Sequence, residues 1–287
     1  MLKYGFVGPA LLLLVALNIF PLVYNVYLST TNTDLSGGAA KSVGDRNYRE
    51  VFSELRYGAA IRTTALFVGA AVLVELVLGF VLALALRDDF RAKGAVLTIL
   101  LIPMMLSPSV MGLFWHLIFK GDYGILNQSL AAVGLPQPDW LTNPSVKLVS
   151  VLIVDIWMWT PFMMLISLAA LNSIPKHLYE AAEIDRAGRW TVLRRITLPM
   201  CAPLLILAAL LRATDALKQF DFVMVLTGPN DAATQTLSAL LYQTAFNGTN
   251  VGLGTAYGFV VLVAVMAFAT VFTRYLDLLQ RRQGRVT

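Results

Sequence analysis

Six long apolar runs decide what this 287-residue sequence can fold into. A helix needs about 20 mostly apolar residues to cross the hydrocarbon core of a bilayer. Runs of about that length without clustered charge lie at residues 5–28, 64–86, 95–119, 148–171, 202–227 and 253–273. The sequence therefore predicts an all-α integral membrane protein with six transmembrane helices. The first run is too long for a signal peptide and lacks a small-residue cleavage site, so it is expected to be a retained span.

Composition supports a membrane protein and one folding unit. Hydrophobic residues make up 57% of the chain and charged residues 14%, against the roughly 25% charge of a soluble domain. The net charge of +5 is typical of basic cytoplasmic loops and argues against a nucleic-acid partner. One cysteine, Cys201, and two histidines, His116 and His177, predict no internal disulfide, structural zinc or other metal site. We expect a single transmembrane domain over 1–287, with its core at 64–276.

The distribution of Lys and Arg predicts the orientation of the spans. With the amino terminus inside, 13 of the 22 Lys and Arg residues fall in inner segments and 7 in outer ones. Inner segments are enriched in these residues, so both termini are expected in the cytoplasm. The first outer loop is the exception, because its five basic residues are interleaved with acidic ones. The last outer loop, residues 228–252, contains no Lys or Arg.

One polar segment, residues 173–199, departs from the membrane pattern. It reads as two short helices: Ser173 is expected to cap the first and Pro175 to lie in its opening turn. Gly188 is expected to end that helix, and Pro199 to stop the second before the fifth span. From the residues alone, an interfacial amphipathic helix that anchors the bundle is an equally good interpretation.

Within this segment, Glu-Ala-Ala-Glu-Ile-Asp-Arg-Ala-Gly at 180–188 is followed by Ile-Thr-Leu-Pro at 196–199. The string resembles the EAA loop of binding-protein-dependent ABC importer permeases. That pattern has Glu-Ala-Ala, three residues, Gly, nine residues, Ile, one residue and Leu-Pro, and the sequence departs from it only at Arg186. Gly188 lies two residues on, which predicts a shifted turn. The resemblance implies contact with an ATPase through Glu180, Ala181, Ala182, Asp185, Arg186 and Gly188.

Other stretches are similar to the carbohydrate, or maltose-type, branch of these permeases. They lie at 157–162, 173–175 and 220–229. The resemblance implies an importer of a sugar or polyol in a bacterial or archaeal cytoplasmic membrane. It also implies a solute-binding protein outside the cell, a second permease, expected to be nonidentical, and two ATPase subunits that bind ATP and Mg²⁺. The chain itself would be non-catalytic and hold no cofactor.

Polar residues at membrane depth are the candidates for substrate contact, because ionisable groups are costly there. Carboxylates accept hydrogen bonds from vicinal hydroxyls, and aromatic rings stack on the apolar face of a sugar, so this mixture suits a polyol. In the fourth and fifth expected spans such residues recur at helical spacing and match the cavity positions of the maltose-type permeases. The candidates are Asp155, Trp159, Asp215, Gln219 and Arg212.

Structural roles, without any substrate contact, are alternative interpretations of these polar residues. Arg212, Asp215, Lys218 and Asp221 alternate in sign at three-residue spacing, so they are equally well explained as a self-neutralising ladder on one helix. Glu75 is expected to make a structural hydrogen bond between helices. In the third span, which two prolines interrupt, Met104, Ser107 and Trp115 are weaker candidates, and a Met or Trp there is more often a packing residue. His116 is expected to be a packed or interfacial histidine.

Other functions lack the residues that they need. The nearest match to a P-loop, around 40–42, has Leu35 and Ala40 in place of both required glycines, so ATP hydrolysis must come from elsewhere. No metal-spaced set or Ser/Lys dyad supports an intramembrane enzyme. A secondary transporter would explain the spans but not the 180–199 pattern. Arg212 and Lys218 leave room for an anionic substrate, such as an acidic sugar or a glycerophosphate.

Overall fold

The computed structural model describes residues 2–37, 40–121 and 123–283. Across these ranges the secondary structure is helical, with two isolated bridges and no named strand. Met1 and residues 284–287 of the expected domain, including Arg285 of the expected inner charges, lie outside the described residues.

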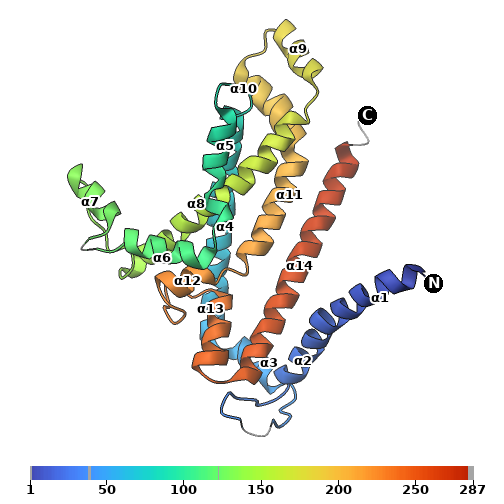
Figure 1. The fold of residues 1–287 in the computed structure, drawn as a ribbon, viewed down its shortest axis with the longest axis vertical. Helices are drawn as coiled ribbons and strands as arrows, with labels where there is room; N and C mark the ends of the chain where they lie inside the picture. Colours follow the sequence, from blue (N-terminus) through green and yellow to red (C-terminus); the bar gives the residue numbers. More distant parts are fainter. Residues whose placement is uncertain (1, 38–39, 122, 284–287) are drawn as a thin grey trace.

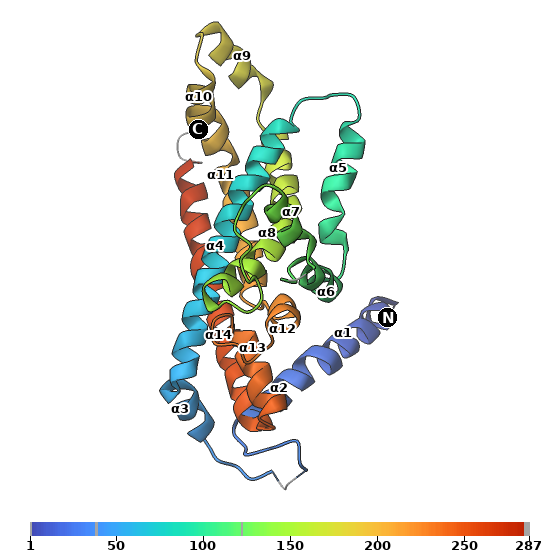
Figure 2. The same cartoon turned by 90° about the vertical axis from the view of Figure 1, so that its left-hand side faces the viewer.

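Four long helices form the body of the molecule: α4 (Leu55–Ala85), α8 (Pro144–Asn172), α11 (Leu198–Ala216) and α14 (Val251–Gln283). Helices α4, α11 and α14 run roughly along the longest axis, and α8 is inclined to them (Figures 1 and 2). Helix α2 contacts α14, and α1 extends away from the body. The remaining elements are α1 (Leu2–Leu14), η1 (Val15–Ile19), α2 (Phe20–Ser29), α3 (Arg46–Ser53), α5 (Lys93–Leu101), η2 (Pro103–Met105), α6 (Pro108–Ile118), α7 (Ile125–Ala132), α9 (Lys176–Ile184), α10 (Arg189–Val192), η3 (Leu193–Thr197), α12 (Asp221–Leu226), α13 (Leu237–Tyr242) and η4 (Gln243–Asn247).

Helix α4 packs along its length against α8, because one of its faces carries small and apolar residues three or four positions apart. At Gly79 on this face a Cβ atom would lie 2.6 Å from the Cβ of Met163 and 2.7 Å from the backbone nitrogen of Met164. A glycine therefore lets the two backbones approach closely, as in other membrane helix pairs. Glu75 lies one turn before Gly79 on the same buried face.

In the described chain, five helical segments are long and apolar enough to cross a membrane. They are Val7–Ser29, Leu55–Ala85, Pro144–Asn172, Arg189–Ala216 and Val251–Arg274. Five of the six expected spans thus have a long helix at their place. The helices of the second and fourth expected spans begin earlier than the apolar runs do, because helix continues into the polar flanks.

The third expected span is a broken helix. Helix α5 ends at Leu101, a short 3₁₀ turn η2 follows, and α6 begins at Pro108. Each of the two breaking prolines opens a new helical element, because proline lacks the N–H needed in a helix interior but is tolerated in the first turn. Helix α6 lies across the long helices rather than along them (Figure 1).

The expected fifth span, 202–227, is wrong at its end. Helix α11 stops at Ala216, and a turn through Leu217–Phe220 leads into the separate short helix α12. No Pro or Gly lies within 212–221, and its charged residues recur at helical spacing, so the sequence does not reveal the turn. Asp221 consequently starts α12, where its side chain accepts a hydrogen bond from Ser109 Oγ at 2.9 Å.

The segment 173–199 contains helices, but three expected boundaries are wrong. Ser173 ends α8 rather than capping α9, whose N-cap is Pro175. Gly188 does not end α9; it precedes α10 as its N-cap. Pro199 does not stop the second helix, because the π turn η3 leads directly into α11 and proline lies in the first turn of that helix. A π turn is one of the ways in which a helix accommodates an interruption of its hydrogen-bond ladder.

Candidate functional site

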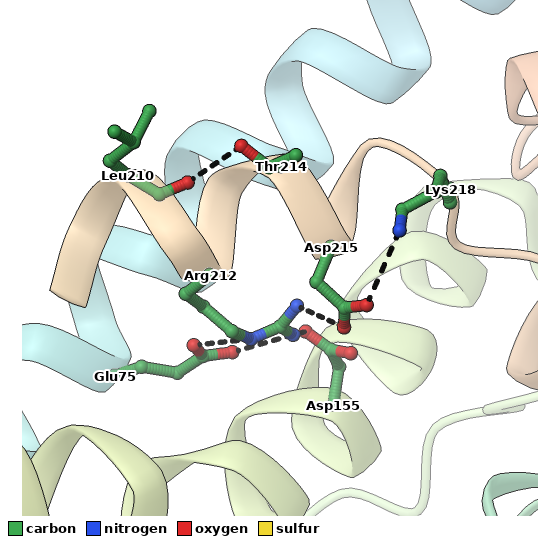
Figure 3. A network of polar contacts seen from close by, with 7 residues as sticks. All are labelled: Glu75, Asp155, Leu210, Arg212, Thr214, Asp215 and Lys218. Atoms are coloured by element: carbon green, nitrogen blue, oxygen red, sulfur yellow. Dashed lines mark hydrogen bonds and ion pairs between the residues drawn. The ribbon is translucent and has the colours of Figure 1, made fainter. Parts of the chain in front are cut away.

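Arg212 of α11 lies at the centre of an ion network between three long helices (Figure 3). Its Nε donates to Oε2 of Glu75 at 2.9 Å, and its Nη2 donates to Oε1 of the same carboxylate at 3.1 Å. Nη2 also donates to Oδ2 of Asp155. Such a fork of two parallel bonds fixes the orientation of both groups. Glu75 comes from α4 and Asp155 from α8, so the network joins α4, α8 and α11.

This network is buried. The Arg212 side chain is 2% exposed, and Glu75 and Asp155 are equally enclosed. Opposite charges and hydrogen bonds compensate for the cost of removing these groups from water. The guanidinium carbon also lies 5.0 Å from the centre of the Trp159 ring, close enough for a cation–π interaction. Arg212 therefore fixes the position of Trp159 on the next turn of α8.

The network opens to solvent at one end. Nη1 of Arg212 lies 3.5 Å from Oδ2 of Asp215, whose side chain is 52% exposed. The side chain of Lys218 is 62% exposed, and its Nζ lies 4.0 Å from Oδ1 of Asp215. The charge ladder expected on the fifth helix is thus present from Arg212 to Lys218, and Asp221 lies outside it. The combination of an exposed carboxylate and a half-buried indole, both held by one guanidinium, can bind hydroxyl groups and an apolar ring face.

The remaining candidates of the membrane region occupy different places. Gln219 lies in the turn after α11, and its Nε2 is buried without a hydrogen-bond partner among the described residues. Glu75 makes the expected hydrogen bond between helices, but its partner Arg212 was not predicted. The signal that could have found the pair is one buried cation and one buried anion on two expected spans.

Helix α6 and the turn before it carry the three weaker candidates and His116. Trp115 packs against the Trp157 ring, with centroids 5.5 Å apart, which agrees with a packing role. His116 is half-buried on the same helix, Met104 lies in η2, and Ser107 precedes α6. No group of three or more His, Cys, Asp or Glu side chains in the described ranges is arranged to hold a metal ion.

A second candidate region is the turn between α9 and α10, which projects beyond the long helices (Figure 1). Ala182 is buried against the rest of the molecule, whereas Glu180 and Ala181 are exposed. Two large apolar side chains flank the turn and stand in solvent: Ile184 is 83% exposed and Trp190 is 70% exposed. Exposed apolar residues of this size mark a surface for a protein partner.

The turn itself is formed at Arg186, not at Gly188. Arg186 has a φ of 50°, in the left-handed region, and Gly188 has an extended backbone. The N–H of Arg186 donates to Glu183 O at 3.0 Å, and the N–H of Ala187 donates to Ala182 O at 2.9 Å. These two bonds define a Schellman turn, in which glycine is usual at the left-handed position. The expected shift of the turn is therefore wrong: Arg186 takes the conformation of the glycine it replaces. Asp185 is exposed beside it.

Comparison with known proteins identifies the family. A family model described as "binding-protein-dependent transport system inner membrane component" matches residues 75–285. The chain belongs to this family. The permease is 36% identical over 268 residues to the probable ABC transporter permease protein y4oQ of Sinorhizobium fredii, which covers 92% of this chain and 86% of that protein. It is 33% identical over 273 residues to the trehalose/maltose transport system permease protein MalF of Thermococcus litoralis, covering 95% and 92%.

A solved structure has the same fold. A chain of a bacterial ABC transporter involved in the import of the acidic polysaccharide alginate superposes on the permease with a TM-score of 0.83. The match covers 96% of the permease and 95% of that chain at 23% sequence identity. The predicted family is confirmed, and the permease has the all-helical fold of an ABC importer membrane subunit.

Proposed function

We propose that the permease forms half of a translocation path for a neutral sugar or polyol that a solute-binding protein delivers. The observation that carries this proposal is that the guanidinium of Arg212 already has partners within the chain. Three carboxylates pair with its nitrogens, and the Trp159 ring lies against it. The Asp215 carboxylate is half exposed and the Trp159 side chain is partly exposed, a pair suited to hydroxyl groups and a sugar ring. The relative named for trehalose and maltose supports this substrate class.

An anionic substrate is the second candidate, because Lys218 is exposed and only 4.0 Å from Asp215. An acidic sugar or a glycerophosphate would use Lys218 as its partner. Arg212 is not available to an anionic substrate, because the guanidinium is buried and already paired with carboxylates.

Uptake by the reconstituted transporter distinguishes the two candidates. For a neutral substrate, Asp215→Asn and Trp159→Leu should each lower uptake about tenfold, the scale of one lost charge-assisted hydrogen bond or ring contact. Lys218→Gln should leave uptake within about twofold. The reverse order would favour an anionic substrate, and parental uptake in all three variants would reject the site. Gln219→Ala and Asp155→Asn extend the test to the other candidates.

The membrane topology that we propose has six crossings, with α5 and α6 together forming the third. Both termini and the α9–α10 turn then lie in the cytoplasm, and residues 1–287 form one transmembrane domain with a core at 64–276. The excess of Lys and Arg in the inner segments supports this orientation. The α9–α10 turn and the end of α14 lie at the same pole of the molecule, which also supports this orientation (Figure 1).

The 173–199 segment is, in this proposal, the EAA loop through which one ATPase subunit drives the permease. Its docking surface consists of the exposed Glu180 and Ala181 on α9, the turn at Arg186, and the apolar side chains of Ile184 and Trp190. Buried apolar anchors of this kind carry most of the affinity of protein interfaces. The ATPase subunits supply the ATP and Mg²⁺ sites, and the permease supplies no catalytic group.

Cysteine cross-linking tests docking and topology together. Cys201 is the only cysteine, so Cys201→Ser gives a background without thiols. In that background Ile184→Cys should cross-link to the ATPase and react with reagents only from the cytoplasm. Phe52→Cys, at an exposed position of α3, should react only from outside. Labelling of both positions from the same side would disprove the proposed orientation.

A further inference from the structure

Tyr179 of α9 contacts residues that flank two of the long helices, at the pole where the α9–α10 turn projects. Its ring lies beneath the guanidinium of Arg87, with Cζ 4.1 Å from the ring centre. Its hydroxyl is 3.2 Å from Oγ1 of Thr197, the last residue before α11. Arg87 lies two residues beyond Ala85, the last residue of α4, and directly follows its C-cap, Leu86. One side chain of α9 thus holds the ends of α4 and α11 together.

The packing around Tyr179 is firm. The backbone of Arg87 is also held, because Nζ of Lys93 donates to its carbonyl oxygen at 3.2 Å. Thr197 is buried, and Tyr179 joins the apolar cluster that contains Leu86 and Cys201. A close-packed cluster transmits displacement rather than absorbing it.

The same two helices are tied again farther along. Glu75 of α4 and Arg212 of α11 form the bidentate ion pair described above. At 1.5 Å per residue, Glu75 lies about 18 Å before Arg87, and Arg212 lies about 22 Å after Thr197. Helices α4 and α11 also pack against one another between these ties. Two helical arms of similar length, joined at both ends, form a closed unit that we call the α4–α11 frame.

We propose that Tyr179 is a positioning residue that passes a displacement of α9 to α4 and α11 as one body. The movement then reaches Arg212 and, through it, Trp159 and Asp215. This inference rests on the proposed docking of the ATPase at α9. The ion pair between Glu75 and Arg212 keeps the two arms in register, because a bidentate fork tolerates little sliding. Without the joint at Tyr179, α9 can move while both arms stay in place.

The experiment uses the complete transporter in liposomes, with its ATPase, second permease and solute-binding protein. The measured quantity is the number of ATP molecules hydrolysed per solute imported. Tyr179→Leu removes the ring and the hydroxyl but keeps an apolar side chain, and should raise this ratio about fivefold or more while the ATPase stays bound. Tyr179→Phe keeps the ring over Arg87 and should raise it about twofold. Lys120→Met, which breaks a cation–π contact with Tyr123 away from α9, should leave it unchanged.

A double variant gives the sharper result. Arg87→Met and Tyr179→Leu disrupt the same contact, so the pair should raise the ratio no more than Tyr179→Leu alone. Independent, multiplicative effects would overturn the inference, and so would an unchanged ratio in Tyr179→Leu with the ATPase bound. Release of the ATPase by Tyr179→Leu would also overturn it, since Tyr179 would then serve docking. Failure of Ile184→Cys to cross-link in the otherwise unmodified transporter rejects the docking proposal instead.

Discussion

Arg186 adopts a left-handed backbone conformation that residues other than glycine, asparagine and aspartate seldom take. Its φ of 50° closes the turn that ends α9, and the two hydrogen bonds of that turn hold it in place. The left-handed conformation costs a residue with a Cβ about 1–2 kcal/mol. The exposed guanidinium has no hydrogen bond that offsets this cost within the described chain, which fits a surface reserved for a partner.

Arg186→Gly should therefore stabilise the turn by about 1 kcal/mol, which thermal unfolding of the purified permease would show as a higher midpoint. Glu183→Gly is the matched control, because Glu183 lies in the right-handed last turn of α9. Glycine there should lower stability by about 1 kcal/mol. Equal effects of the two substitutions would mean that the turn is not strained.

Arg212 allows a test that separates folding from transport. Arg212→Leu should destabilise the permease by about 3–5 kcal/mol, because it leaves Glu75 and Asp155 buried without a partner. Replacing all three residues by Leu should restore folding, since a buried ion network can be exchanged for apolar packing at little cost. Thermal unfolding of the purified permease in detergent measures the stability of each variant, and uptake by the reconstituted transporter measures transport. A triple variant that transports normally would show that the network has a structural role only.

The sequence allowed the charged residues of the site to be selected, but not their pairing. Each ionisable residue at membrane depth stands out against apolar neighbours, so Asp155, Arg212 and Asp215 could be chosen without a structure. Glu75 and Arg212 are 137 positions apart, and the pair depends on how α4 crosses α11. Helical spacing reports neighbours on one helix only. It therefore showed the Arg212–Asp215 contact and missed the stronger bond to Glu75.

At the scale of the helices, the close crossing of α4 and α8 at Gly79 is a specific constraint. Gly79→Ala should cost about 1–3 kcal/mol, because the added Cβ meets the backbone of α8 rather than a movable side chain. Gly69→Ala on the same helix has open space around its Cβ and should be neutral or mildly stabilising. Thermal unfolding and the amount of permease recovered from membranes would compare the two.

The long helices were predictable because hydropathy reports the length of a run that must lie in lipid. Their interruptions were predictable only where a residue type causes them. Pro103 and Pro108 mark the break between α5 and α6 in the sequence. The turn after Ala216 has no such mark, since residues 217–220 are Leu, Lys, Gln and Phe and include neither proline nor glycine. Tertiary packing of α12 against α6 determines it instead.

At the scale of the whole molecule, much apolar surface of the single permease is exposed. The segment Val7–Ser29 has none of its most apolar window buried in this chain. Lipid and other subunits must cover such surfaces. We expect mass measurement of the intact transporter to give this permease together with a second permease and two copies of an ATPase. A transport-active preparation that contains the permease as its only membrane subunit would contradict this composition.

The break in the third segment bears on how the nascent chain enters the bilayer. Helices α5 and α6 have 9 and 11 residues, and about 20 are needed for a segment to partition into lipid by itself. The translocon should therefore release residues 93–118 into the membrane only after α8 has been synthesised and can pack against them. Glycosylation-site mapping of truncated chains would test this order: chains that end before residue 144 should leave the segment uninserted, and chains that extend past residue 172 should insert it.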